Sequence, residues 1–263
     1  MSEGLDDDVI IRFEHVRKVF GRQTVYRDLT LDVYRGEILA LIGASGSGKS
    51  VLLKLILGLL RLDAGAILVE GEDITSRSER DLIPIRRKVG MVFQNGALFD
   101  SLSVFDNIAY PLRERGVRDR AALSARVAEV LEMVGLPGIQ PKMPAELSGG
   151  MRKRVSLARA VAEVPKVLLY DEPTTGLDPV NVRRITELIV DLRERLDTTS
   201  IVVTHDLASA FLISDRMAMV AEGRIVAVDV TSEFRRNPNP IVQEFLTAMD
   251  MPPRSRPPSK DPR

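Results

Sequence analysis

The chain has 263 residues, and its 37 lysines and arginines balance 37 aspartates and glutamates, so the formal net charge is zero. Proteins that coat nucleic acid usually carry a basic surplus, so this balance argues against nucleic acid as a partner. The absence of cysteine excludes disulfides and thiolate metal sites, and two histidines make a histidine-rich metal centre improbable. With 44% hydrophobic residues, most of the chain has a globular composition that excludes disorder.

The N-terminal residues 1–8 are acidic, and no apolar run of signal-peptide form follows them, so we expect the chain to stay in the cytoplasm. The longest apolar stretches, residues 38–44 and 51–60, fall well short of the ~18 residues that a membrane span needs. If the protein works at a membrane, we expect another chain to cross it.

The first hundred residues read as strands around one glycine-rich loop. Residues 38–42 are continuously apolar and end at glycines, which is typical of a strand buried on both faces of a sheet. Residues 50–60 follow without a proline and are rich in helix formers, which predicts the order strand, loop, helix. The other expected strands here are residues 9–13 and 29–33, which begin an N-terminal β layer, and residues 67–69 and 89–93.

A helical insertion is expected to interrupt this α/β pattern over about residues 99–162. Within it, apolar residues recur on one helical face at Leu123, Val127, Val130, Leu131 and Val134. The α/β pattern resumes with strands at 167–170 and 201–204, helices at 179–196 and 207–213, and a hairpin of 217–221 and 224–228. Strands that alternate with helices predict a mostly parallel sheet covered on both faces.

These patterns predict one α/β domain over residues 1–248. Its core is expected at about 9–98 and 163–235, with a C-terminal helical extension at about 236–248. Residues 249–263 are rich in proline and lack a hydrophobic pattern, so we expect a disordered tail there.

The segment from Gly43 to Ser50 has the spacing of a phosphate-binding loop, namely a glycine, four residues and then Gly-Lys-Ser. Glycines let backbone N–H groups converge on phosphate oxygens, Lys49 can reach the β- and γ-phosphates, and the Ser50 hydroxyl can ligate Mg²⁺. The predicted nucleotide-binding residues of this segment are Gly43, Ala44, Ser45, Gly46, Ser47, Gly48, Lys49, Ser50 and Val51.

Two adjacent carboxylates, Asp171 and Glu172, follow the expected strand at 167–170. They lie at the carboxyl end of that strand, where open α/β sheets bind ligands. Alone, such a pair is more often a helix cap or a solvated turn, but the phosphate loop upstream reverses this preference. We expect Asp171 to hold Mg²⁺, usually through water, and Glu172 to polarise the water that attacks the γ-phosphate.

A third segment, Leu147-Ser148-Gly149-Gly150-Met151, precedes an expected helix. Ser148 is a good helix cap, and the glycines leave backbone amides open toward an anion. A capped helix start without a ligand would be the better interpretation in isolation. One chain has no evident need for two phosphate-binding helix ends, however, so we expect two copies to face each other, each lending this segment to the other's nucleotide.

In this order the motifs resemble those of the nucleotide-binding subunits of ATP-binding cassette transporters, over about residues 9–235. The resemblance implies a P-loop NTPase (RecA-like) α/β core with an N-terminal antiparallel β layer and a helical insertion subdomain. It also implies ATP and Mg²⁺ as cofactors and hydrolysis of ATP by a homodimer. In the family pattern, Gln94 contacts Mg²⁺ and the attacking water, His205 donates to the γ-phosphate and orients Glu172, and Asp178 links the two sites of the dimer.

Two aromatic residues are candidates for the adenine contact. Phe20 stands where the family places an aromatic that stacks on the base, while Tyr26 is expected to pack against the sheet instead. We interpret His15 as an ordinary surface or strand histidine. The basic run 152–154 is expected to be a solvated helix face, with contact to a partner as the alternative.

Residues 93–100 and 103–114 resemble those of the ATPases of Mla/Mce-type phospholipid transport systems, as do Met151 and residues 237–245. This resemblance implies an MlaE-like permease and an Mce-domain lipid-binding protein as partners. It places the chain on the cytoplasmic face of the inner membrane, held there by the permease. Leu177 and the preceding Thr174-Thr175 follow the general cassette pattern instead, which leaves the branch of the family open.

The loop after Gln94 contains three successive apolar residues, Ala97, Leu98 and Phe99. Loops usually avoid this composition unless another surface covers them. One hypothesis is that these residues line a groove that receives a helix of the permease, so that ATP-driven closure is transmitted through Gln94. The equal alternative is that they pack inside the helical insertion.

Other functions stay open at this stage. The same ATPase could serve another small-molecule importer or exporter. A soluble cassette protein that acts on ribosomes or DNA typically has two cassettes or a long coiled-coil insertion, and this sequence has neither. A metabolic phosphotransferase would leave the Leu147–Met151 segment and His205 without a purpose.

Overall fold

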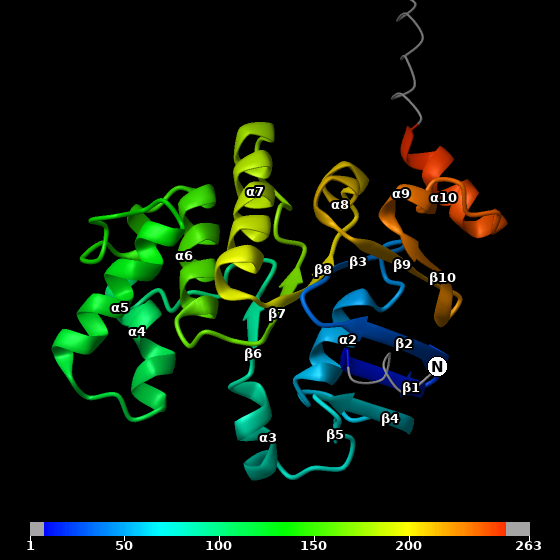
Figure 1. Ribbon diagram of the computed structural model, residues 1–263, viewed down its shortest axis with the longest axis horizontal. Helices are drawn as coiled ribbons and strands as arrows, with labels where there is room; N and C mark the ends of the chain where they lie inside the picture. Colours follow the sequence, from blue (N-terminus) through cyan, green and yellow to red (C-terminus); the bar gives the residue numbers. More distant parts are fainter. Residues whose placement is uncertain (1–7, 251–263) are drawn as a thin grey trace, which may run out of the picture.

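The computed structural model describes residues 8–250, and the proline-rich segment 251–263 lies outside the described residues. A six-stranded sheet with the order β10-β9-β3-β8-β7-β6 forms its centre (Figure 1). The strands are β3 (Ile38–Ile42), β6 (Val89–Val92), β7 (Val167–Asp171), β8 (Thr199–Val203), β9 (Arg216–Ala221) and β10 (Arg224–Val230). Their pairings are parallel except that of β9 with β10, which form the expected hairpin.

A second, antiparallel sheet has the order β2-β1-β4-β5. It consists of β1 (Val9–Phe20), β2 (Gln23–Tyr34), β4 (Ala64–Val69) and β5 (Glu72–Asp73). The first two strands are much longer than the sequence pattern predicts. The pairing of β1 with β2 shifts register between Phe13 and Val16, and His15 adopts a positive φ of 48°. This irregularity interrupts the two-residue alternation by which strands are recognised.

The central sheet has apolar cores on both of its faces because successive side chains of a strand point to opposite faces. Leu39 and Leu41 of β3 pack with α2 (Lys49–Ile56) and the antiparallel sheet. Ile38 of the same strand packs on the opposite side with α6 (Gly149–Val161) and α7 (Pro179–Leu196). The predicted strand, loop and helix therefore lie between a β layer and a helical layer.

The helical region lies at one side of the sheet, at the left of Figure 1. It contains α4 (Val104–Glu114), α5 (Arg120–Met133), a short 3₁₀ turn at Pro144–Glu146 and α6. The predicted apolar face of α5 is buried, since Leu123, Val127, Val130 and Leu131 are at most 4% exposed. The remaining helices are α3 (Glu79–Arg86), α8 (Leu207–Ile213), α9 (Thr231–Phe234) and α10 (Pro240–Asp250).

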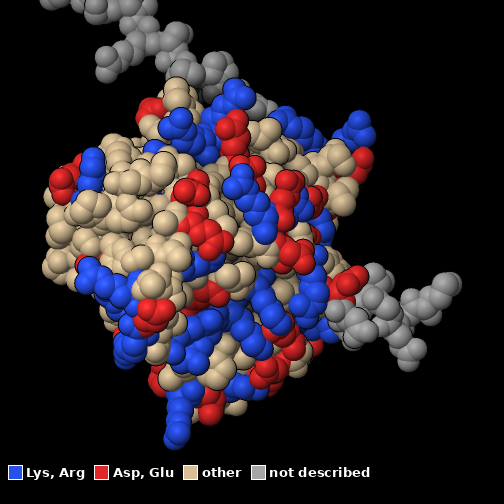
Figure 2. Space-filling model, turned by 60° about the vertical axis from the view of Figure 1, so that its left-hand side comes forward, with Lys and Arg blue, Asp and Glu red and all other residues tan. Residues whose placement is uncertain are grey.

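Between residues 8 and 250, the helices are too short or too polar for any of them to cross a bilayer. Positive and negative side chains are interspersed on the face that Figure 2 turns forward, and a broad area at its left carries few charges.

Candidate active site

The phosphate-binding loop connects β3 to α2, as the sequence predicts. Gly43, Gly46 and Gly48 all have positive φ, at 149°, 79° and 105°. A Cβ on Gly43 would lie 2.3 Å from the Val220 carbonyl oxygen, so a larger residue cannot occupy this position without moving the backbone. The glycines therefore set the path of the loop at the end of the buried strand.

Tyr26 supports this loop from the antiparallel sheet. Its side chain is fully buried, and its hydroxyl donates a 2.6 Å hydrogen bond to the carbonyl oxygen of Gly48. Burial raises the pKa of Tyr26 well above its usual range, so the hydroxyl keeps its proton and can act as the donor. The sequence predicts that Tyr26 packs against the sheet; it is buried but belongs to β2 itself, and its contact with the loop is an addition that sequence reasoning missed.

Lys49 begins α2 and is 7% exposed. Its Nζ donates to the carbonyl oxygens of Gly43 at 2.8 Å and Ala44 at 3.0 Å. Burial lowers the pKa of Lys49, and the nearby carboxylates of Glu172 and Asp171 oppose this effect. The side chain is thus a cation held between the loop and the two carboxylates.

Ser50 and Asp171 meet although 121 positions separate them in the chain. The Ser50 hydroxyl lies 2.6 Å from Oδ1 of Asp171, at the carboxyl end of β7. Both groups offer oxygen atoms, which are the ligands that Mg²⁺ prefers. The pair therefore fits a magnesium ion between the phosphate loop and the acidic strand.

Glu172 follows β7 in an unusual backbone conformation, with a φ of 50°. Its N–H donates to the Val203 carbonyl oxygen at 2.9 Å. Its Oε2 lies 2.7 Å from Nδ1 of His205 and 3.2 Å from the Thr175 hydroxyl. The predicted pairing of Glu172 with His205 is therefore present.

A cavity of about 410 Å³ brings most of the predicted site residues together. Its lining includes Phe20, Ser45, Gly46, Gly48, Lys49, Ser50, Val51, Gln94, Glu172 and His205. The predicted residues Gly43, Ala44, Ser47 and Asp171 do not line it, although Asp171 contacts Ser50. Gln23 and Val25 also line the cavity, and sequence reasoning missed them because they belong to the unexpected first part of β2.

Phe20 ends β1 at the rim of this cavity and is 42% exposed. The Lys18 ammonium lies 4.9 Å from the centre of its ring. An exposed aromatic face beside the phosphate loop fits the predicted stacking on a base.

The segment Leu147–Met151 lies outside the lining of this cavity. Ser148 caps α6 as predicted, because its hydroxyl accepts the N–H of Met151 at 3.2 Å. Gly150 is buried against α7, where an added Cβ would lie 2.6 Å from Oδ1 of Asn181. Asp178 caps α7 and accepts the N–H groups of Val180 and Asn181. Ser148 and Gly149 remain exposed.

The prediction of a solvated face at 152–154 is wrong for two of its three residues. Arg152 is exposed, but Lys153 and Arg154 are only 7% and 8% exposed. Arg154 donates to the carbonyl oxygens of Val134 and Gly135, which links α6 to the end of α5. The backbone groups that surround these cations come from distant loops, so the local sequence does not reveal their burial.

One of the three apolar residues of the loop 97–99 packs inside the helical region, as the second of the two hypotheses predicts. Leu98 packs against the core of the helical region. Phe99 is 44% exposed, and its ring centre lies 5.0 Å from that of Tyr110, which is 42% exposed. The buried Asn107 fixes this loop, since it accepts the Phe99 N–H and donates to the Phe99 carbonyl oxygen.

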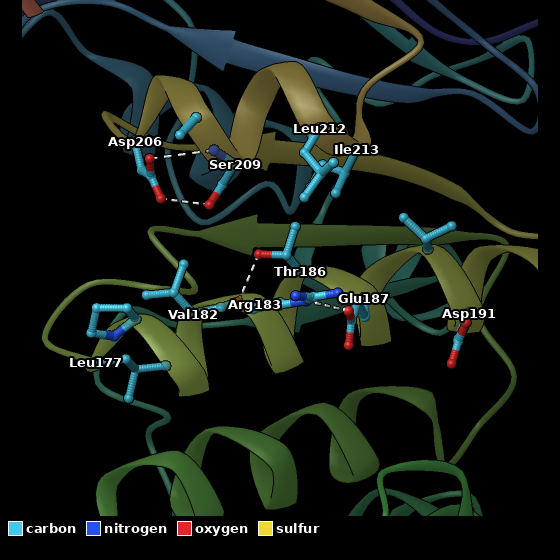
Figure 3. Close-up of a pocket in the computed structure, with 13 residues that line it drawn as sticks. Leu177, Val182, Arg183, Thr186, Glu187, Asp191, Asp206, Ser209, Leu212 and Ile213 are labelled. Atoms are coloured by element: carbon cyan, nitrogen blue, oxygen red, sulfur yellow. Dashed lines mark hydrogen bonds and ion pairs between the residues drawn. The ribbon is translucent and has the colours of Figure 1, made fainter.

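A separate hollow of about 780 Å³ lies between α7 and α8 (Figure 3). Leu177, Val182, Leu212 and Ile213 give it apolar walls, and it also contains carboxylates. No residue of the phosphate loop reaches this hollow among the described residues. The smaller cavity contains residues of the phosphate loop together with Glu172 and His205, so it is the candidate active site.

Fold and site together define a P-loop protein that binds and hydrolyses ATP, with ATP and Mg²⁺ as its cofactors. A family model described as "ABC transporter" matches residues 26–175, and the chain belongs to this family. Its architecture is the expected P-loop NTPase core with an antiparallel β layer and a helical insertion.

The chain is similar to several curated proteins of this family. It is 41% identical over 242 residues to the "Intermembrane phospholipid transport system ATP-binding protein MlaF" of Haemophilus influenzae, covering 92% of both chains. It is 42% identical to the protein of that name from Escherichia coli K12, covering 86% of this chain and 84% of the relative. It is also 41% identical to the "Probable ribonucleotide transport ATP-binding protein mkl" of Mycobacterium leprae, covering 90% of this chain and 69% of the relative.

Two solved structures have the same fold. The first is a dimeric post-hydrolysis state of the ATP-binding cassette MJ0796 bound to ADP and Pi, with a TM-score of 0.77 and 30% identity. It covers 84% of this chain and 98% of the other. The second is cbiO1 from Clostridium perfringens, with a TM-score of 0.81, 30% identity and coverage of 88% and 92%.

Proposed function

We propose that this chain is the ATPase subunit that energises phospholipid transport through a separate membrane permease. The observation that carries the proposal is the cavity in which Lys49, Glu172 and His205 meet, in a chain that matches a phospholipid transport ATPase over 92% of both lengths. The subunit works as a homodimer on the cytoplasmic face of the inner membrane, where the permease holds it. An MlaE-like permease and an Mce-domain lipid-binding protein are its partners.

The proposed hydrolysis is an in-line attack of water on the γ-phosphate. The loop amides and Lys49 bind the phosphates, while Phe20 stacks on the adenine. Ser50, Asp171 and Gln94 would hold the Mg²⁺, which neutralises negative charge on the phosphates when bound. Glu172 accepts a proton from the attacking water. His205 orients the Glu172 carboxylate through the 2.7 Å contact and faces the γ-phosphate.

In the proposed homodimer, each Leu147–Met151 segment completes the other subunit's site. The exposed Ser148 and Gly149 at the start of α6 support this role, since helix N-termini attract phosphate groups. The segment does not line its own subunit's cavity, which fits a contact with the partner's ATP. Asp178, also exposed at the start of α7, couples the two sites.

The exposed rings of Phe99 and Tyr110 form the docking surface that we propose for the permease. They follow the loop of Gln94, so a permease helix seated on them would sense closure of the nucleotide site. The interspersed charges of the surface in Figure 2 favour specific docking over a general attraction to anionic lipid.

Transport assays can test the substrate, because one set of relatives is named for phospholipid and another for ribonucleotide transport. Tagged chain would be purified from membranes together with its associated subunits, which mass spectrometry would identify. The complex would then be reconstituted in liposomes that contain a labelled phospholipid, with the Glu172→Gln complex as the control. ATP-dependent lipid transfer supports the proposal, whereas transfer of a labelled ribonucleotide without lipid transfer contradicts it.

A further inference from the structure

One face of α6 presents a row of donors to the loop that follows β6. Lys153, Ser156 and Arg159 are three residues apart, so they lie on the same side of the helix. Each of the three donates to a backbone carbonyl oxygen of the loop. Lys153 Nζ donates to Gln94, and Ser156 Oγ donates to Gly96 at 2.8 Å. Arg159 donates to Gly96 at 3.0 Å and to Ala97 at 2.7 Å. The helix that begins at the Leu147–Met151 segment thus holds the Gln94 loop within one subunit.

Lys153 reaches a second functional loop as well. Its Nζ lies 3.4 Å from the carbonyl oxygen of Glu172. The backbone of Glu172 is left-handed, a conformation that non-glycine residues rarely adopt. The same carbonyl accepts the N–H of Thr175 at 3.3 Å. Lys153 therefore bridges the ends of β6 and β7 at the two residues that we place around the attacking water.

Burial of the Lys153 ammonium costs free energy unless nearby polar groups compensate for it. Its side chain is buried, and burial of a cation is unfavourable unless polar groups compensate for the lost water. The two backbone carbonyls and the carboxylates of Asp171 and Glu172 provide this compensation, and the carboxylates oppose the lowering of the Lys153 pKa by burial. An apolar residue of similar length would fill the same space without that cost, so the ammonium group itself is the useful feature.

We propose that Lys153 is a positioning residue for hydrolysis, which fixes the backbone of Glu172 relative to the Gln94 loop and to the helix that begins at the Leu147–Met151 segment. The inference rests on the proposed function. In the proposed dimer, the Leu147–Met151 segment contacts the ATP of the partner subunit. When α6 binds that nucleotide, Lys153 therefore orients Glu172 toward the ATP of its own subunit. Lys153 acts through Glu172 and does not itself touch the substrate.

The test compares steady-state ATP hydrolysis by the purified full chain and its variants. Lys153→Met removes the donor and keeps the length of the side chain, and Lys54→Met is the control because Lys54 is exposed on α2. We expect kcat of Lys153→Met to fall about tenfold or more, with the KM for MgATP within about twofold of the parent. Lys153→Arg, which keeps the charge and the donors, should recover part of the loss. An unchanged kcat in Lys153→Met overturns the proposal.

A double-variant cycle separates positioning from a general loss of structure. If Lys153 acts through Glu172, adding Lys153→Met to Glu172→Gln will leave the residual rate unchanged. A further tenfold fall in the double variant overturns the proposal. If Lys153→Met does not fold, Lys153→Leu replaces it, with the same expected loss of kcat and the same contradicting result.

The outcome also distinguishes this inference from the proposed function. If Glu172→Gln hydrolyses ATP at the parent rate, the assigned catalytic roles fail, and the role of Lys153 fails with them. If Glu172→Gln stalls hydrolysis while Lys153→Met keeps the parent kcat, only the inference about Lys153 is wrong.

Discussion

Nδ1 of His205 lies 2.7 Å from Oε2 of Glu172, across the carboxyl ends of two neighbouring strands. An ionised carboxylate only accepts hydrogen bonds, so this contact requires a proton on Nδ1. The pair therefore fixes the direction of the carboxylate and the orientation of the imidazole ring.

Glu172→Gln should bind ATP but stall its hydrolysis. The amide has the same shape as the carboxylate but cannot take a proton from water, and loss of a general base typically costs about 10²–10⁴ in rate. The unhydrolysed nucleotide should hold two subunits together. Light scattering with MgATP and with MgADP will measure the dimer, and turnover at the parent rate would remove Glu172 from the role of base.

Lys49→Ala should lose nucleotide binding. Its ammonium is the buried cation of the phosphate loop. A hydrogen bond of a charged group contributes about 1.5–3 kcal/mol, so losing one should lower the affinity for MgATP roughly tenfold to a hundredfold. Calorimetric titration with MgATP will measure this loss, with Lys54→Ala on the exposed side of the same helix as the control. Unchanged affinity in Lys49→Ala would rule out the phosphate-loop assignment.

Tyr26→Phe should weaken the loop without unfolding the protein. The ring still fills its buried space, but the 2.6 Å hydrogen bond to Gly48 is lost. The carbonyl oxygen of Gly48 keeps the N–H of Val51 at 2.7 Å, so we expect a loss of about 1 kcal/mol in unfolding free energy. Affinity for MgATP should fall a few-fold. If denaturant unfolding and ATP titration both match the parent, the hydroxyl has no supporting role.

The phosphate loop and the acidic strand could be predicted because their chemistry is local. Gly43 to Ser50 are consecutive residues between a strand and a helix whose patterns are unambiguous, and Asp171 ends a fully apolar strand. The contact of Ser50 with Asp171 follows from the parallel topology, which brings the carboxyl ends of strands to one edge of the sheet.

The environment of Lys153 could not be predicted in the same way. It lies 59 positions from Gln94 and 19 from Glu172 along the chain, and each contact is made with a backbone carbonyl rather than with a distinctive side chain. A basic run at the start of a helix usually faces solvent, so the local pattern favours the wrong answer. The sequence predicts that Tyr26 packs against the sheet, but its hydrogen-bond partner depends on how the antiparallel sheet packs under the loop.

Stability should fall in acid because of Glu70. Partial burial alone would raise its pKa, but hydrogen bonds from Lys166 and Lys88 outweigh this effect and lower the pKa from 4.5 to about 2. The ionised form is therefore stabilised by folding. Its contribution is fully present above the ordinary value and is lost as the pH falls from about 5 through about 2. Denaturant unfolding at a series of pH values should show this slope, and Glu70→Gln should flatten it; an equal slope in both proteins would contradict the assignment.

Replacing Phe99 and Tyr110 with serine should release the chain from its permease while leaving its intrinsic ATPase activity intact. Leu98→Asp is a poorer test, because Leu98 packs against the helical core and a carboxylate there would destabilise the fold. Phe99 and Tyr110 are both exposed by more than 40%, so their loss removes an apolar surface at little cost in stability. Ile83→Ser on α3 removes a comparably exposed apolar residue elsewhere and serves as the control. Copurification from membranes will measure permease binding, and ATPase assays of the purified chain will measure intrinsic activity. A double variant that still retains the permease would show that docking depends on another surface.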